Sequence, residues 1–292
     1  MLKLSSVSVE GRISDIALDI EAGQWWTLLG PNGAGKSSLL SVCAGLEQYD
    51  GNIAITPRLT LQTQAHSDKP NSDKTNSDKT HSDKTNSDKT HSDKTHRNKH
   101  CAALRDLPLS QLSAFRCMLT QQHQLQFHLS VSELFSFFTA LDNIPAPIDD
   151  ALSITELIDQ AFHQLSGGEQ QRVHLARNLM QVWPAIETGS ALLILDEPLQ
   201  QMDVRIQIKS LTLFQSLASL GNTIIMSDHD INHALHFSTH CLLLKGGRQL
   251  KHGPSQEVLS LENLERLYQH KFEWIERADS HTVRKYCVAR AD

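Results

Sequence analysis

The chain has 292 residues, of which 39% are hydrophobic, so it is long enough to bury one large core or two smaller lobes. Its formal net charge of −6, from 27 basic and 33 acidic residues, gives no strong basic field, and no nucleic acid partner is expected. Five cysteines without a CxxC pair favour reduced thiols over a disulfide framework, and no apolar run approaches the roughly 20 residues that span a bilayer.

The amino-terminal region is expected to hold three strands, a helix and a fourth strand, without the apolar stretch of a signal peptide. Residues 2–9 alternate between apolar and polar side chains and residues 13–20 do so in part, which favours half-buried antiparallel strands. The apolar run from Trp25 to Leu29 ends at a glycine, as a fully buried strand would. A helix is predicted from Ser37 to about Gly45, and another strand over residues 52–55.

The segment between the buried strand and that helix reads GPNGAGKS and fits the phosphate-binding pattern GxxxxGK[ST]. Glycines let backbone N–H groups turn inward, and the helix N-terminus adds positive potential. Lys36 would reach the β- and γ-phosphates, and the Ser37 hydroxyl would hold magnesium. A glycine-rich turn with a solvated lysine is the alternative, and the flanking strand and helix weigh against it. The expected ATP-binding residues are Gly30, Pro31, Asn32, Gly33, Ala34, Gly35, Lys36, Ser37 and Ser38.

Residues 66–95 are six repeats of the form [HN]-S-D-K-[TP], and residues 66–100 contain no aliphatic or aromatic side chain. A segment with nothing to bury cannot offset the entropy cost of ordering, so a flexible surface insertion is predicted. The alternative is a metal-binding tract formed by its histidines and Cys101, but nothing there would fix the geometry of the ligands.

The rest of the chain is expected to build a parallel sheet. Residues 104–138 are interpreted as mixed and mostly helical. Apolar strands are predicted over residues 191–195 and 223–226, with helices before and between them, which is the pattern of a parallel sheet. A hairpin is predicted around Gly246-Gly247.

Three polar residues follow the two apolar strands, at the edge where open α/β sheets bind their ligands. Asp196 would bind magnesium, and Glu197 would orient and deprotonate the attacking water. His229 would donate a hydrogen bond to the γ-phosphate or the water. An acidic pair that merely ends a strand, and a histidine in an ordinary loop, are the alternatives for these residues.

The stretch Leu165–Arg172 reads LSGGEQQR. Ser166 and Glu169 form a capping-box pair, so a helix should begin at Ser166, with Val173, Ala176 and Met180 on its buried face. Two glycines in a first turn are poor for helix stability but suit a close approach to a bound anion. Since the chain already has one phosphate-binding turn, this second one is expected to serve the nucleotide of another subunit.

In their order along the chain these motifs resemble the ATPase subunits of the ABC transporter family. The resemblance implies an α/β fold with a P-loop NTPase core and parallel sheet, a small antiparallel β lobe and a helical signature lobe over about 122–180. Residues 1–292 would form one nucleotide-binding domain, with the repeat tract as an insertion. Gln121 resembles the glutamine loop and would join Ser37 and Asp196 at magnesium, and Asp203 resembles the aspartate loop of the dimer interface. The signature residues that would contact the partner's ATP are Leu165, Ser166, Gly167, Gly168 and Glu169.

The family resemblance also implies a function. It implies a homodimer that binds ATP and Mg²⁺ and drives two transmembrane permease subunits from the cytoplasmic face of a bacterial inner membrane, with a periplasmic substrate-binding protein as an indirect partner. The sequence is most similar to the ATPases of cobalamin (vitamin B12) importers, with heme and iron–siderophore importers as alternatives. A soluble ABC ATPase of DNA repair or translation fits less well, because the chain has one P-loop and no sustained heptads. A regulatory module without turnover is disfavoured by Glu197.

Two positions depart from the family pattern. No aromatic residue lies near Arg12, where the family often stacks a ring on adenine, so the base is expected either to be held loosely or to contact the Arg12 guanidinium. The aspartate loop reads QQMD, ending at Asp203, where a serine and a leucine usually precede the aspartate.

Overall fold

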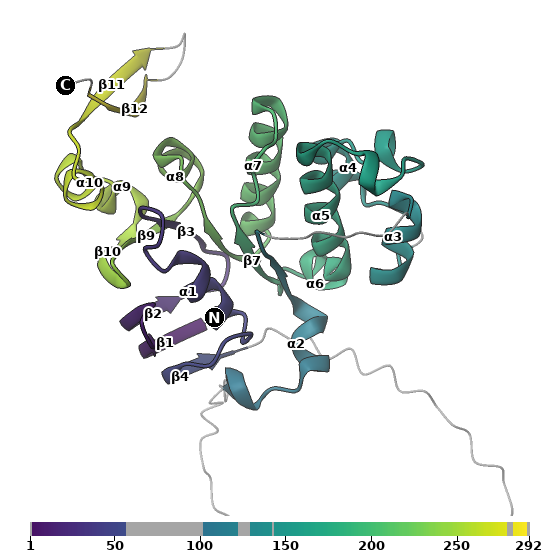
Figure 1. Cartoon of the computed structure of the whole chain (residues 1–292), viewed down its shortest axis with the longest axis horizontal. Helices are drawn as coiled ribbons and strands as arrows, with labels where there is room; N and C mark the ends of the chain where they lie inside the picture. Colours follow the sequence, from purple (N-terminus) through teal and green to yellow (C-terminus); the bar gives the residue numbers. More distant parts are fainter. Residues whose placement is uncertain (1, 57–101, 122–128, 142, 279–282, 291–292) are drawn as a thin grey trace, which may run out of the picture.

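The computed structural model describes residues 2–56, 102–121, 129–141, 143–278 and 283–290. They form a four-stranded antiparallel sheet, a six-stranded central sheet, a helical lobe and a carboxyl-terminal hairpin (Figure 1). The insertion predicted at residues 66–100 lies outside the described residues. The predicted α/β architecture with a β lobe and a helical lobe is confirmed.

The antiparallel lobe has the strand order β2-β1-β4-β5. Its strands are β1 (Leu2–Val9), β2 (Ile13–Ile20), β4 (Asp50–Ile55) and β5 (Ala102–Ala103). The predicted alternation holds at both ends of β1, but Ser6 takes a positive φ of 49° and shifts the register between Leu4 and Val7. The leucines and isoleucines of both strands and Val7 are nevertheless buried, whereas Val9 is half-buried and Ala17 is exposed.

The central sheet has the order β10-β9-β3-β8-β7-β6. Its strands are β3 (Trp25–Leu29), β6 (Arg116–Leu119), β7 (Leu192–Asp196), β8 (Thr223–Ser227), β9 (His240–Lys245) and β10 (Arg248–Pro254). All neighbours are parallel except the hairpin β9–β10. The parallel sheet and the hairpin at Gly246-Gly247 were both predicted. Strand β6 was not, because it is only four residues long, begins with an arginine and has a run of only three apolar residues.

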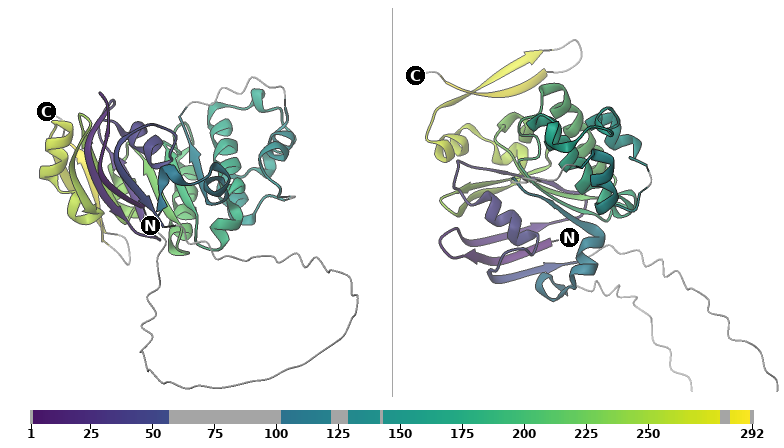
Figure 2. Two further views of the ribbon diagram at one scale, coloured as in Figure 1. Left: turned by 90° about the horizontal axis from the view of Figure 1, so that it is seen from below. Right: turned by 45° about the vertical axis from the view of Figure 1, so that its right-hand side comes forward.

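Helices cover both faces of this sheet. In Figures 1 and 2, α1 (Lys36–Cys43) lies on the side of the antiparallel lobe, and α7 (Val204–Ser219) and α8 (Ile231–Phe237) lie on the opposite side. The helical lobe contains α3 (Val131–Phe138), α4 (Ala146–Leu152) and α5 (Gly167–Gln181). The remaining helices are α2 (Leu109–Phe115), α6 (Trp183–Glu187), α9 (Ser255–Val258) and α10 (Leu261–Tyr268), with 3₁₀ turns at Leu104–Asp106, Thr155–Leu157 and Phe162–Gln164.

A hairpin of β11 (Phe272–Ala278) and β12 (Val283–Ala289) follows α10 and projects from the body of the molecule (Figure 1). The sequence interpretation did not include it. The Asn232 side chain anchors it to α8, since its amide donates to the Cys287 carbonyl oxygen over 3.1 Å and its oxygen accepts the Cys287 N–H over 2.7 Å.

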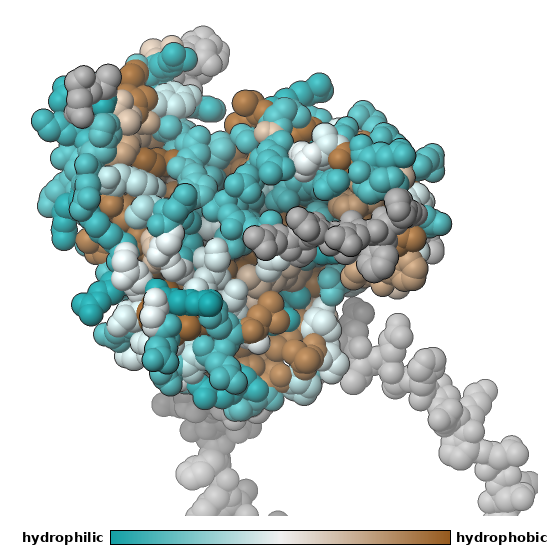
Figure 3. Space-filling model, in the orientation of Figure 1, coloured by the Kyte–Doolittle hydropathy of each residue, from teal (hydrophilic) through white to brown (hydrophobic). Residues whose placement is uncertain are grey.

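One continuous hydrophobic core joins the antiparallel lobe, the central sheet and the helical lobe, and a smaller cluster lies under α9 and α10. The four described cysteines, Cys43, Cys117, Cys241 and Cys287, are free and buried. Figure 3 shows a mostly hydrophilic face, with hydrophobic side chains gathered near its lower edge, in the area where Figure 1 places α2. No helix in the described ranges is both long and apolar enough to cross a membrane.

Candidate active site

The predicted phosphate-binding loop connects β3 to α1 at the carboxyl edge of the central sheet. Gly35 caps α1 with a φ of 99°, a left-handed conformation that disfavours side chains. A Cβ at Gly35 would lie 2.6 Å from Cγ2 of Ile13 and 2.9 Å from the Arg12 carbonyl oxygen. The turn after β1 therefore packs directly against the loop, and only glycine fits between them.

Lys36 lies across this loop instead of extending into solvent. Its Nζ donates to the carbonyl oxygens of Gly30 at 2.8 Å and Pro31 at 3.3 Å. Burial lowers the pKa of Lys36, while the charges of Glu197 and Asp196 oppose that shift. The positive charge of Lys36 thus lies within the electrostatic influence of both carboxylates.

The two acidic residues follow each other at the end of β7 but have different surroundings. Asp196 Oδ1 accepts a hydrogen bond from the Ser227 hydroxyl over 2.6 Å. Glu197 Oε1 lies 2.6 Å from His229 Nε2, and its Oε2 is buried without a hydrogen-bond partner among the described residues. Asp196 is the last residue of β7, whereas Glu197 lies just beyond the strand with a φ of 49°, so the two carboxylates meet different partners.

Most of the residues predicted for this edge line one cavity of about 480 Å³, but Gly30, Pro31 and Asp196 do not. It is lined by Gly11, Arg12, Asn32, Gly33, Ala34, Gly35, Lys36, Ser37, Ser38, Gln121, Glu197, Gln200 and His229. Gln121 reaches it because β6 ends two residues earlier at the edge of the sheet. The guanidinium of Arg12 lines the cavity while it donates to Glu47 Oε1 over 2.8 Å. The structure therefore brings together residues that are scattered from 11 to 229 in the chain.

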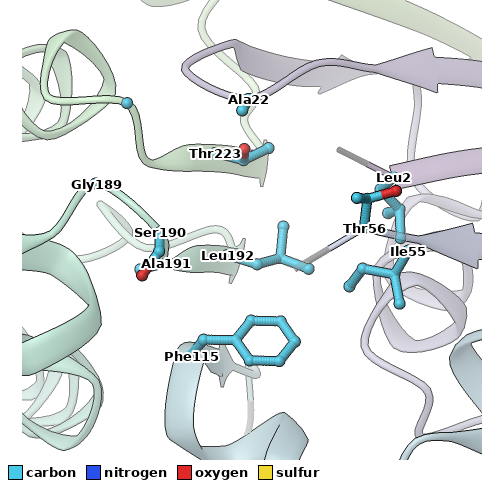
Figure 4. Close-up of a pocket in the computed structure, with 11 residues that line it drawn as sticks. Leu2, Ala22, Ile55, Thr56, Phe115, Gly189, Ser190, Ala191, Leu192 and Thr223 are labelled. Atoms are coloured by element: carbon cyan, nitrogen blue, oxygen red, sulfur yellow. The ribbon is translucent and has the colours of Figure 1, made fainter. Parts of the chain in front are cut away.

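A second cavity lies at the opposite, amino-terminal edge of the same strands (Figure 4). Leu192 and Thr223 at the starts of β7 and β8 line it, together with Leu2, Ile55 and Phe115. Its volume of about 20 Å³ is room for about one water molecule. This space is too small and too apolar to be a site for a nucleotide.

The residues proposed for magnesium fit that ion in chemical type. Ser37, Gln121 and Asp196 would offer a hydroxyl, an amide oxygen and a carboxylate, which are the oxygen ligands that Mg²⁺ prefers. The buried, unpartnered Oε2 of Glu197 adds negative charge beside them. Within the described part of the chain no three His, Cys, Asp or Glu side chains converge on a metal site. A magnesium ion here would complete its shell with phosphate and water oxygens, as Mg²⁺ usually does.

The signature helix α5 begins as predicted. Ser166 is its N-cap, and the capping box with Glu169 is complete: Ser166 N–H donates to Glu169 Oε2 over 2.8 Å, and Ser166 Oγ accepts Glu169 N–H over 3.4 Å. Val173, Ala176 and Met180 are buried as predicted. Residues 165–169 are all described, and none of them lines the 480 Å³ cavity. The signature and the phosphate-binding loop are thus separate within one chain.

The structure gives a further reason why residues 167 and 168 are glycines, which the sequence interpretation did not include. A Cβ at Gly167 would lie 2.3 Å from Gln201 Oε1, and one at Gly168 would lie 2.4 Å from the Gln201 carbonyl oxygen. The loop that precedes Asp203 therefore packs on the first turn of α5. Asp203 itself is exposed and caps α7, since its Oδ1 accepts the N–H of Ile206 over 3.0 Å.

Three further residues at this edge were missed by sequence reasoning. Ser227 contacts both acidic residues, and the Gln171 side chain donates to the carbonyl oxygens of Glu197 and Pro198 at 3.4 and 3.3 Å. Gly247, predicted only as a turn residue, donates its N–H to the Ala34 carbonyl oxygen over 3.1 Å. The double glycine at 246–247 was a sequence signal for Gly247, whereas no sequence signal marks Ser227 or Gln171.

An ion-paired histidine stabilises the loop that carries His229. Asp228 Oδ1 accepts the N–H groups of His229 and Asp230, and its Oδ2 lies 3.0 Å from Nδ1 of His233. Burial alone would lower the pKa of His233, but the hydrogen bond and charge of Asp228, together with Asp230, raise it. Asp228 thus holds the backbone of the loop with one carboxylate oxygen and pairs with His233 through the other.

Comparisons with known proteins agree with this arrangement. A family model described as ABC transporter matches residues 13–200. The vitamin B12 import ATP-binding protein BtuD of Vibrio cholerae is 28% identical over 277 residues, covering 92% of this chain and 93% of that protein. The protein of the same name from Yersinia enterocolitica is 30% identical over 280 residues, covering 94% of this chain and 93% of that protein.

Solved structures share the fold. An inward-facing ABC transporter of proposed metal-chelate type matches with a TM-score of 0.68 at 19% identity, covering 99% of this chain and 97% of that one. The dimeric ATP-binding cassette MJ0796, bound to ADP and Pi, matches with a TM-score of 0.59 at 21% identity, covering 87% of this chain and 99% of that one.

Proposed function

Because the chain belongs to the ABC transporter family, as one of its ATP-hydrolysing subunits, we propose that it energises the import of vitamin B12. The support is the similarity to vitamin B12 import ATP-binding proteins over more than nine-tenths of both chains. Import of heme or of an iron–siderophore is the second candidate, since the likeness to a transporter of proposed metal-chelate type fits such a cargo as well.

The proposed chemistry assigns a task to each residue that the sequence predicted for the site. Residues 30–38 bind the phosphates, with Lys36 at the β- and γ-phosphates. Glu197 orients the attacking water and takes its proton, and His229 holds the Glu197 carboxylate and the γ-phosphate. Ser37, Gln121 and Asp196 would hold Mg²⁺, which when bound neutralises charge on the phosphates. The Arg12 guanidinium would contact the adenine ring.

We further propose that two copies form a head-to-tail homodimer. Residues 165–169 would then complete the ATP site of the partner, and Asp203 would lie at the interface. The separation of the signature from the cavity within one chain supports this proposal. The dimer would act on two permease subunits at the cytoplasmic face of the inner membrane and, through them, on a periplasmic binding protein.

The observation that carries the hydrolytic assignment is the 2.6 Å contact between His229 and Glu197 beside the phosphate-binding loop. In the test, Glu197→Gln is expected to bind ATP with nearly wild-type affinity but to lose turnover and to accumulate as an ATP-bound dimer in size-exclusion chromatography. Lys36→Ala should lose ATP binding itself. Hydrolysis by Glu197→Gln at the wild-type rate would contradict the assignment of the base.

The cargo is tested separately. Cells that carry the chain with its cognate permease should take up radiolabelled cobalamin, and Glu197→Gln should abolish that uptake. Uptake of heme or an iron–siderophore, but not of cobalamin, would establish the second candidate instead.

A further inference from the structure

A buried hydroxyl at the end of β8 faces both acidic residues of the site. Ser227 is the last residue of β8 and lies opposite Asp196 in the parallel register of β7 and β8. The two residues are almost wholly buried, with exposed fractions of 0% and 3%. The pairing of these strands therefore fixes the Ser227 side chain against the end of β7.

The Ser227 hydroxyl uses both of its hydrogen-bonding capacities. It donates its proton to Asp196 Oδ1 over 2.6 Å and accepts the backbone N–H of Glu197 over 2.9 Å. A hydroxyl has a single proton, so the bond to the carboxylate fixes its rotation and leaves a lone pair for the N–H group. One side chain thus connects the carboxylate of Asp196 to the backbone of Glu197.

The backbone of Glu197 requires such a restraint. Its φ of 49° lies in the left-handed region, which a residue other than glycine holds only where its surroundings impose it. Ser227 restrains the Glu197 backbone, and His229 restrains the Glu197 carboxylate at 2.6 Å. Both restraints come from residues 227–229, so the position of Glu197 is set from the neighbouring strand as well as from its own.

We propose that Ser227 is a positioning residue for ATP hydrolysis, whose hydroxyl holds the carboxylate of Asp196 and the backbone of Glu197 in a fixed mutual arrangement. The inference rests on the hydrolytic function proposed above. A buried serine that is only structural would affect the stability of the fold without a specific effect on turnover or on the use of Mg²⁺.

The first measurement is turnover. Ser227→Ala removes both hydrogen bonds, and kcat for ATP should fall about 10- to 100-fold. Ser227→Thr keeps the hydroxyl and should retain most of the wild-type kcat. Ser210→Ala is the matched control, because Ser210 is equally buried in α7 and its hydroxyl has no hydrogen-bond partner among the described residues. Its kcat should equal that of the wild type.

The second measurement separates binding from chemistry. In the Glu197→Gln variant, which should bind ATP without turnover, adding Ser227→Ala should raise the Mg²⁺ concentration for half-maximal ATP binding several-fold, with ATP affinity in EDTA unchanged. An unchanged kcat in Ser227→Ala, or an unchanged Mg²⁺ midpoint in the double variant, would overturn the proposal.

If Ser227→Ala does not fold, Ser227→Cys keeps the size of the side chain with a weaker donor, and a wild-type kcat in that variant would overturn the proposal. Failure of the underlying function would look different, since the wild-type chain itself would then lack ATPase activity that depends on Lys36.

Discussion

At the scale of single residues, the site depends on contacts between side chains that are distant in sequence. His229 is 32 positions from Glu197, yet their side chains meet at 2.6 Å. The sequence predicted both residues because each lies at or within three residues of the end of an apolar strand. Ser227 could not be predicted, because a serine at the end of a strand is common and only the register of β7 and β8 places it against Asp196.

One prediction at this scale concerns pH. The pKa of His233 is raised in the folded state, so its ion pair with Asp228 contributes stability fully below the unfolded pKa of about 6.5. That contribution is lost as pH rises through the higher folded pKa. His233→Asn should therefore reduce the free energy of unfolding more at pH 6 than at pH 9, as measured by urea denaturation.

Asp228→Asn removes the other member of this pair and should likewise reduce the free energy of unfolding more at pH 6 than at pH 9. An equal loss of stability at both pH values would show that His233 contributes packing and not charge. ATP turnover should be measured in parallel, since Asp228 also holds the backbone of His229.

At the scale of elements, the sequence predicted strands and helices best where hydrophobic periodicity or capping is strong. The buried run of β3 and the start of α5 at Ser166 were predicted to the residue. Strand β6 and the hairpin β11–β12 were missed. Both are short or mixed in composition, and their conformation depends on a neighbouring element, β7 for the first and α8 for the second.

In the first turn of α5, alanine substitutions at Gly167 and Gly168 should have different effects on stability. A Cβ at Gly168 would collide with the backbone oxygen of Gln201, which cannot move without its loop, so Gly168→Ala should cost about 1–3 kcal/mol of unfolding free energy. A Cβ at Gly167 meets only the Gln201 side chain, which can swing away. Gly167→Ala should therefore be nearly neutral, because alanine favours the helix by about 1 kcal/mol.

Chemical denaturation of the two variants checks this difference. Gly168→Ala should also reduce ATPase activity, because the displaced loop carries Asp203 at its end. Equal stability of the two variants would mean that the packing of the loop on α5 contributes little to the fold.

At the scale of the whole molecule, the predicted insertion at residues 66–100 lies between two neighbouring strands, β4 and β5, and can therefore be deleted. Strands β4 and β5 are antiparallel neighbours, with Ala54 opposite Ala103, so the chain leaves and re-enters the sheet at one point. Deletion of residues 66–100 leaves a short connection between these strands. ATPase activity and melting temperature should stay close to those of the full chain, because the deleted sequence has no apolar side chain to bury.

Enzyme assay and thermal denaturation of the deleted chain measure both quantities. A large loss of either one would mean that the repeats pack or bind, and the metal-binding alternative could then be examined by adding Zn²⁺ to the full chain.

The proposed dimer gives a second prediction at this scale. Ser166→Arg should block closure while leaving ATP binding by the isolated chain intact, whereas Lys36→Ala should abolish that binding. In a mixed dimer one composite site carries both changes and the other carries neither, so mixing the two variants should restore part of the ATPase activity. If Ser166→Arg weakens ATP binding by the single chain as much as Lys36→Ala does, the shared site is refuted.

The hydrogen bonds of the Gln171 side chain would couple the two ATP sites of the proposed dimer. This side chain belongs to the helix that begins with the signature, yet it donates to the carbonyl oxygens of Glu197 and Pro198 in the same chain. In the proposed dimer, the nucleotide bound by one chain would contact the signature of its partner. A shift of the partner's helix α5 would then move Gln171 and, with it, the backbone of Glu197 in that same partner chain. Occupancy of one site would thus change the reactivity of the other, and the ATP dependence of the rate would depart from a hyperbola.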